Sequence, residues 1–162
     1  MEERFSASPF PNDSDPAESA APREQAQARL AIWLVEDSAT DAFVIGEVLR
    51  HCRMPFDLTV MTDGDAALVR LQRAEAGEKS AIPDLVLLDL NLPKISGIQV
   101  LAALRKSQAC GAVPVIVVTS SDSASDMKAI RELGVTSYFR KPHSLDAFMS
   151  LSEVIKAAIT RE

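Results

Sequence analysis

Residues 82–93 read "IPDLVLLDLNLP", in which an unbroken apolar run, Leu85–Leu88, leads directly into Asp89. A short continuous apolar run bounded by turn residues is typical of a strand that is buried on both faces. Such strands occur in parallel sheets covered by helices on either side. The run therefore predicts a central strand, and Asp89 is a carboxylate held at the end of it.

The chain from residue 30 onward alternates apolar runs of strand length with segments of helical periodicity. Strands are expected at residues 30–35, 56–61, 84–90, 113–119 and 136–139. Helices are expected at residues 40–52, 65–74, 96–107 and 123–133, with a last one that begins after Ser144. This order predicts an α/β fold, a doubly wound, parallel, five-stranded sheet with helices on both faces. Ligands of such sheets bind outside the carboxyl ends of the strands, at a topological switch point.

Composition narrows the classes of function. The 162 residues are 47% hydrophobic and 25% charged, with a net charge of −6. This charge argues against binding to nucleic acid or to an anionic membrane. The longest apolar runs are of strand length, and the N-terminus lacks the features of a secretory signal. We therefore expect a cytoplasmic protein, in which Cys52 and Cys110 are reduced.

The N-terminal stretch differs in texture from the rest of the chain. Residues 1–28 are rich in Pro, Ser, Ala and acidic residues, and offer little apolar surface to bury. They predict a flexible leader, followed by one domain over residues 29–162.

Polar or ionisable groups follow four of the five expected strands. They are Glu36-Asp37, Asp89, Thr119-Ser120 and Lys141. In a parallel sheet these groups converge on one edge, where three carboxylates would repel one another unless they share protons or bind a cation. Mg²⁺ suits a site with a few carboxylates and open positions for water or phosphate. A carboxylate nucleophile, a metal, a lysine and a hydroxyl are together what phosphoryl transfer needs.

These residues carry a family resemblance. The acidic pair Glu36-Asp37, "LLDLNLPKISG" around Asp89, "VVTSS" around Thr119 and "YFRKP" around Lys141 resemble the motifs of the receiver domain of two-component response regulators. The resemblance covers residues 30–161 and implies a flavodoxin-like (βα)5 fold. It also implies that the protein accepts a phosphoryl group from a sensor histidine kinase or a phosphotransfer protein.

The resemblance also implies roles at the metal end of the site. Asp89 is similar to the phosphoacceptor of the family, and Asp37 to its direct Mg²⁺ ligand. Glu36 is expected to act through a bound water, and Asn91 to offer its backbone carbonyl to the metal. Pro93 and Gly97 match the loop that follows the phosphorylation site in the family.

The remaining matches lie on the phosphoryl side. Thr119 resembles the switch hydroxyl, and Tyr138 resembles the aromatic residue that changes rotamer with it. Lys141 resembles the phosphate-binding lysine, and the Lys141-Pro142 bond resembles a peptide bond that the family often holds cis.

The long segment "LVRLQRAEAGEKSAIPD" at residues 68–84, together with "VEDSATDAFVIGEVL" and "DLNLPKISGIQVL", is similar to the small single-domain regulators that serve phytochrome-type kinases. Such a protein is expected to signal by changing partners or by acting as a phosphoryl intermediate, and no output domain is expected after the receiver. The resemblance permits either a homodimer, through the face formed by the fourth helix, the fifth strand and the last helix, or a monomer in which the same apolar residues face the core.

Two other functions remain open at this point. One is a receiver-like scaffold that binds partners without phosphorylation. The presence of all the acidic and basic residues of the site argues against it. The other is an aspartyl-nucleophile phosphatase, which would need an acid at position 91 to protonate the leaving group. Asn91 cannot do so, and we expect a phosphoacceptor rather than an enzyme.

Overall fold

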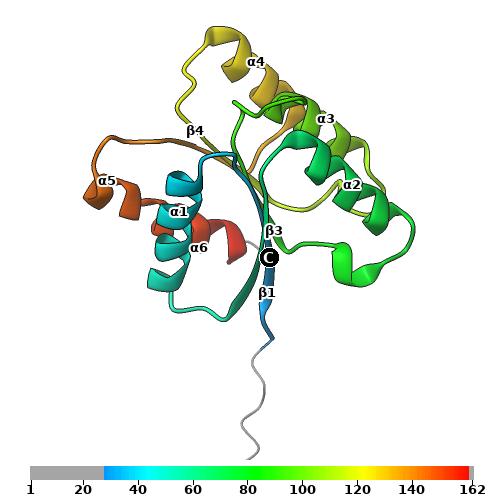
Figure 1. The fold of residues 1–162 in the computed structure, drawn as a ribbon, viewed down its shortest axis with the longest axis horizontal. Helices are drawn as coiled ribbons and strands as arrows, with labels where there is room; N and C mark the ends of the chain where they lie inside the picture. The colour runs from blue at the N-terminus through cyan, green and yellow to red at the C-terminus, as the bar shows by residue number, and fades with distance from the viewer. Residues whose placement is uncertain (1–27, 161–162) are drawn as a thin grey trace, which may run out of the picture.

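The computed structural model of the chain describes residues 28–160. A single parallel sheet runs through it in the order β2-β1-β3-β4-β5 (Figure 1). Its strands are β1 (Leu30–Val35), β2 (Phe56–Met61), β3 (Leu85–Leu88), β4 (Val115–Thr119) and β5 (Ser137–Arg140). The chain passes from β1 outward to β2 and then returns to the other side of β1 to form β3, so the switch point lies between β1 and β3.

The helices cover both faces of the sheet, as expected. They are α1 (Ala39–His51), α2 (Gly64–Glu75), α3 (Gly97–Lys106), α4 (Ala124–Leu133), α5 (Leu145–Met149) and α6 (Leu151–Ile159), with a short 3₁₀ turn, η1 (Lys79–Ala81). Helices α1, α5 and α6 lie on one side of the sheet, and α2, α3 and α4 on the other (Figure 1). The predicted α/β fold, including its flavodoxin-like strand order, is confirmed.

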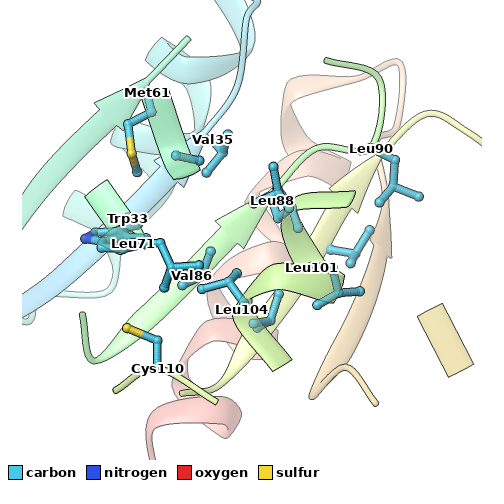
Figure 2. Packing of buried hydrophobic residues seen from close by; sticks show 14 of the residues in the cluster. Trp33, Val35, Met61, Leu71, Val86, Leu88, Leu90, Leu101, Leu104 and Cys110 are labelled. Carbon is cyan, nitrogen blue, oxygen red and sulfur yellow. The ribbon is translucent and has the colours of Figure 1, made fainter. Parts of the chain in front are cut away.

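Alternate residues of the central strands pack into two separate hydrophobic cores, one on each face of the sheet. On β3, Val86 and Leu88 pack with residues of α2, α3 and α4, in the cluster shown in Figure 2. Leu85 and Leu87 point to the opposite face and pack with α1, α5 and α6. All four residues are fully buried, which explains why this strand is apolar without alternation.

Most helices begin at a side-chain cap. The N-cap side chain accepts a hydrogen bond from a backbone N–H of the first turn at Ser38, Asp63, Ser96, Ser123 and Ser144. Each cap satisfies a donor that a helix start would otherwise leave free, and this sets where each helix leaves its loop. At the other end of α4, Gly134 takes the left-handed conformation (φ 70°), as its C′ position predicts.

The expected elements match the observed ones to within a few residues at each end, with one difference in the last helix. Ser150 separates α5 from α6. Its N–H bonds to the carbonyl of Ala147, three residues back, and its hydroxyl donates to the same carbonyl at 2.6 Å. Serine competes for backbone partners in this way, and the result is an interruption of the helix.

Both cysteines are buried, and neither forms a disulfide, as predicted. Cys110 belongs to the core on one face of the sheet and Cys52 to the core on the other, so the sheet lies between them. Within residues 28–160, no helix is long and apolar enough to cross a membrane. The predicted leader, residues 1–28, lies almost entirely outside the described residues, as do the last two residues of the chain.

Candidate functional site

The sheet ladder continues past β1 and β3 and places two acids side by side. Asp89 donates its backbone N–H to the carbonyl of Val35 at 3.0 Å. Glu36 donates its own N–H to the carbonyl of Met61 at 2.9 Å. These bonds extend the strands by one residue on either side of the switch point. Both side chains are buried, Glu36 with 1% and Asp89 with 4% of its surface exposed.

Lys141, which directly follows the edge strand β5, contacts the same acids. Its backbone N–H donates to the carbonyl of Thr119 at 2.9 Å, which fixes it just beyond β5. Its side chain is 9% exposed, and Nζ lies 2.7 Å from Glu36 Oε2, 2.8 Å from Asp41 Oδ2 and 3.0 Å from Asp89 Oδ2. An ammonium group has three N–H donors, so these carboxylates engage all of them.

Burial and hydrogen bonding shift the pKa values of this cluster. Desolvation raises the pKa of Glu36 to about 7, and the hydrogen bonds from Lys141 and the Ser38 N–H offset only part of this effect. Desolvation alone would lower the pKa of Lys141, but its bonds to Asp41, Glu36 and Asp89 outweigh it and raise the pKa above that of an ordinary lysine. The two directions are compatible because one ammonium group serves three carboxylates. Lys141 stays charged because three carboxylates stabilise it, while Glu36 is stabilised by only one of the three hydrogen bonds that Lys141 donates.

Three carboxylates at this edge have the arrangement of a metal site. Ligand oxygens of Glu36, Asp37 and Asp89 lie within 4.8 Å of one another, with Asp37 exposed and the other two buried. Hard oxygen donors around an open position suit a small divalent cation such as Mg²⁺, so these residues fit the expected metal. Asn91 lies in the adjoining loop, where its backbone N–H donates to Asp89 Oδ1 at 3.2 Å.

Thr119 and Tyr138 both form a side-chain hydrogen bond to the loop that follows β4. Thr119 ends β4 and is fully buried, and its Oγ1 accepts the N–H of Ser121 at 3.2 Å. The Tyr138 hydroxyl donates to the Ser121 carbonyl at 2.8 Å. Among residues 28–160, no hydrogen bond joins either side chain to Asp89. The two predicted switch residues are therefore linked through Ser121, in the loop between β4 and α4.

The loop after Asp89 requires the predicted glycine. A Cβ atom on Gly97 would lie 2.1 Å from the backbone oxygen of Asp89, and the Gly97 N–H donates to the carbonyl of Leu90 at 2.9 Å. Gly97 thus lets the start of α3 rest directly on the backbone of the acidic residue. The expected cis bond between Lys141 and Pro142 is wrong, because this peptide bond is trans, the form of lower intrinsic energy.

Asp41 also belongs to this site, although the sequence pattern does not assign it there. In the sequence it lies near the start of the helix expected over residues 40–52, where a negative charge is favourable. That placement is correct, since Asp41 lies in the first turn of α1. Its contact with Lys141, 100 residues further along the chain, has no signal in local periodicity.

Comparison with known proteins decides the family. A family profile described as "Response regulator receiver domain" matches residues 32–153. The chain belongs to this family. Rcp1, a response regulator of Synechocystis sp., is 37% identical to this receiver domain over 126 residues, which cover 78% of the chain and 86% of Rcp1.

Solved structures agree with the family. The Mn²⁺-bound form of Rcp1 matches the receiver domain with a TM-score of 0.73 and 36% identity, over 82% of this chain and 97% of that one. The phosphorylated cyanobacterial phytochrome response regulator RcpA matches with a TM-score of 0.75 and 30% identity, over 83% and 97%. The receiver domain therefore serves phosphorylation-based two-component signalling and has phytochrome-associated relatives. Neither the scaffold nor the phosphatase alternative is favoured.

Proposed function

We propose that Asp89 of this receiver domain accepts a phosphoryl group from a histidine kinase or a phosphotransfer protein, and that the modified domain then changes its binding partners. The observation that carries this proposal is the buried Asp89 carboxylate, which contacts Lys141 and lies within reach of Glu36 and Asp37. Asp89 is the member of this acidic set that follows the central strand β3. The structure thus supports the predicted site of phosphorylation.

Mg²⁺ would be held by Glu36, Asp37, Asp89 and the backbone carbonyl of Asn91, and Glu36 would act through a bound water. The Mn²⁺-bound form of Rcp1 supports a divalent cation in a related protein. The cation would neutralise negative charge on the phosphoryl oxygens as it is transferred.

The chain's own residues perform the transfer. An oxygen of the Asp89 carboxylate attacks phosphorus, an O–P bond forms, and the P–N bond of the phosphohistidine breaks, with its electron pair left on the imidazole nitrogen. Lys141 donates N–H bonds to the phosphoryl oxygens, and Thr119 donates its hydroxyl to another. Thr119 would then lose its hydrogen bond from the Ser121 N–H. Tyr138, whose hydroxyl donates to the Ser121 carbonyl, would change rotamer as that loop moves.

We propose a phosphoacceptor rather than a phosphatase because residue 91 is an asparagine, which has no acidic proton for a leaving group. The domain would act in the cytoplasm, and its kinase would be of the phytochrome type that its relatives suggest. A homodimer through α4, β5 and the α5–α6 segment remains a prediction. Most apolar residues of α6, such as Leu151 and Ile155, belong to the core rather than to that surface.

A small phosphodonor such as acetyl phosphate tests the proposal directly. With Mg²⁺, the wild-type protein should gain an acid-stable, hydroxylamine-labile adduct, measured by intact mass. Asp89→Asn should give none, because an amide oxygen is too weak a nucleophile to replace the carboxylate. Asp122→Asn is the matched control, since Asp122 is exposed, pairs with Arg140 and should leave the adduct unchanged. An unmodified wild-type protein would favour the scaffold function instead.

A further inference from the structure

Asp41 differs from the other two carboxylates that hold Lys141. Glu36 and Asp89 both belong to the acidic set whose oxygens lie within 4.8 Å of one another. Asp41 is outside that set among the described residues, yet its Oδ2 lies 2.8 Å from Lys141 Nζ. Its side chain is 32% exposed, so it stands at the mouth of the site rather than at its base.

The start of α1 holds Asp41 in a fixed relation to the acidic pair. The backbone N–H of Ser38 donates to Glu36 Oε1 at 3.0 Å, and the Ser38 hydroxyl accepts the N–H of Asp41 at 3.2 Å. Lys141 then joins the Asp41 and Glu36 side chains from the other side. Glu36, Ser38, Asp41 and Lys141 therefore form a closed ring of hydrogen bonds, in which the position of Asp41 is determined from both ends.

Lys141 needs such an anchor because its side chain is long and has several rotatable bonds. Holding it in one place costs conformational entropy, which a charged hydrogen bond offsets. A divalent cation would draw on the carboxylates of Glu36 and Asp89, to which Lys141 also bonds. A phosphoryl group on Asp89 would accept hydrogen bonds from the Lys141 donors that Glu36 and Asp89 use in its absence. The bond to Asp41 is the one that competes with neither.

We propose that Asp41 is a positioning residue, which keeps the Lys141 ammonium group at the site during phosphoryl transfer through a hydrogen bond that no metal ligand supplies. This inference rests on the proposed function of Asp89 and goes beyond it, since Asp41 touches neither the phosphoryl group nor the metal. Asp41 acts entirely through Lys141, and this dependence makes its role separable from a general effect of charge or of helix stability.

A double-mutant cycle on the rate of phosphorylation tests the dependence. Asp41→Ala should lower the rate with acetyl phosphate and saturating Mg²⁺ roughly three- to tenfold, the size expected for one charged hydrogen bond. Asp41→Asn keeps an oxygen acceptor and should recover part of the loss. In a Lys141→Met background, Asp41→Ala should have no further effect. An equal loss in both backgrounds would overturn the proposal, because Asp41 would then act independently of Lys141.

A second measurement does not involve phosphorylation. The Lys141 ammonium group, held by three carboxylates, should give its own signal in a ¹H–¹⁵N spectrum of lysine side chains, recorded with a chelator. Asp41→Ala should broaden this signal or remove it. Asp65→Ala, which removes an acid from the first turn of α2, is the matched control and should leave it intact. The proposal would be refuted if Asp41→Ala changed neither the Lys141 signal nor the rate of phosphorylation. If the wild-type protein formed no adduct but its Lys141 signal still depended on Asp41, only the role of Asp89 would be refuted.

Discussion

Leu88 and Asp89 are neighbours in the chain and both are buried, but they belong to regions that differ in energetics. Leu88 lies in an apolar core where burial is favourable in itself. Asp89 lies one residue further on, where burial is costly for a charged group and only partners offset it. Three carboxylates share one ammonium group at this edge, so the edge gains little from its own contacts.

The difference shows how the molecule divides its work. The apolar strands stabilise the fold, and the fold then holds charges in an arrangement that they would not adopt alone. If this division is correct, a change in the core should cost stability and leave the chemistry, while a change at the edge should do the reverse. Three variants test where the division breaks down.

The largest effect on stability is expected for Leu88→Ala. Removal of a fully buried leucine should lower the free energy of unfolding by about 3 kcal/mol, measured by urea denaturation. Phosphorylation by acetyl phosphate should stay within about twofold of wild type at temperatures where the protein is folded, because Asp89 is held by backbone bonds. Val69→Ala, at an exposed site, is the control and should change stability little. A folded Leu88→Ala protein that cannot be phosphorylated would show that core and edge are not separable.

Gly97→Ala should give a smaller loss of stability together with a loss of chemistry. The new methyl group would collide with the backbone of Asp89 and Leu90, at a cost of about 2 kcal/mol. The shift of Asp89 should also slow phosphorylation. Gly134→Ala makes a matched control, since Gly134 has a positive φ but no atom within 4 Å of an added Cβ. It should cost about 1 kcal/mol through backbone strain alone and leave phosphorylation unchanged. Equal phosphorylation rates in the two variants would contradict the role given to Gly97.

The effect expected for Glu36→Gln is a change in the pH dependence of stability rather than a fixed loss. Because burial raises the pKa of Glu36 to about 7, the folded state binds a proton that the unfolded state has already released at pH 5–7. This contribution to stability is complete below the unfolded pKa, near 4.5, and is lost as pH rises through 7. The free energy of unfolding, measured with a chelator, should fall by roughly 1–3 kcal/mol more in wild type than in Glu36→Gln between pH 5 and pH 8. Parallel curves for the two proteins would mean that Glu36 is charged throughout this range.

The sequence predicts the frame of the site well because the frame follows from strand ends. Glu36, Asp89, Thr119 and Lys141 each come at the end of a strand or directly after it, and parallel strands bring their carboxyl ends to one edge. The acids and the lysine do converge there. The convergence needs no knowledge of side-chain geometry, only of strand direction.

Contacts made across the fold were beyond the reach of the sequence. Asp41 has the same local pattern as any acid at a helix start, and only the tertiary fold brings the start of α1 to Lys141, which follows β5. The interruption at Ser150 depends on which carbonyl its hydroxyl reaches, and helical periodicity continues through it. The link from Thr119 and Tyr138 to Ser121 is likewise a matter of loop conformation.

The backbone bonds at the strand ends have a consequence for how the protein can vary. Glu36, Asp89 and Lys141 are each placed by a main-chain N–H that bonds to a neighbouring strand. Every amino acid except proline has this N–H, so the backbone at these positions is indifferent to which side chain it carries. The side chains of the site can therefore be exchanged while the backbone that carries them keeps the same hydrogen bonds. Substitutions here can alter chemistry while the coordinates of the backbone stay the same, which makes these positions good starting points for redesigning what the domain binds.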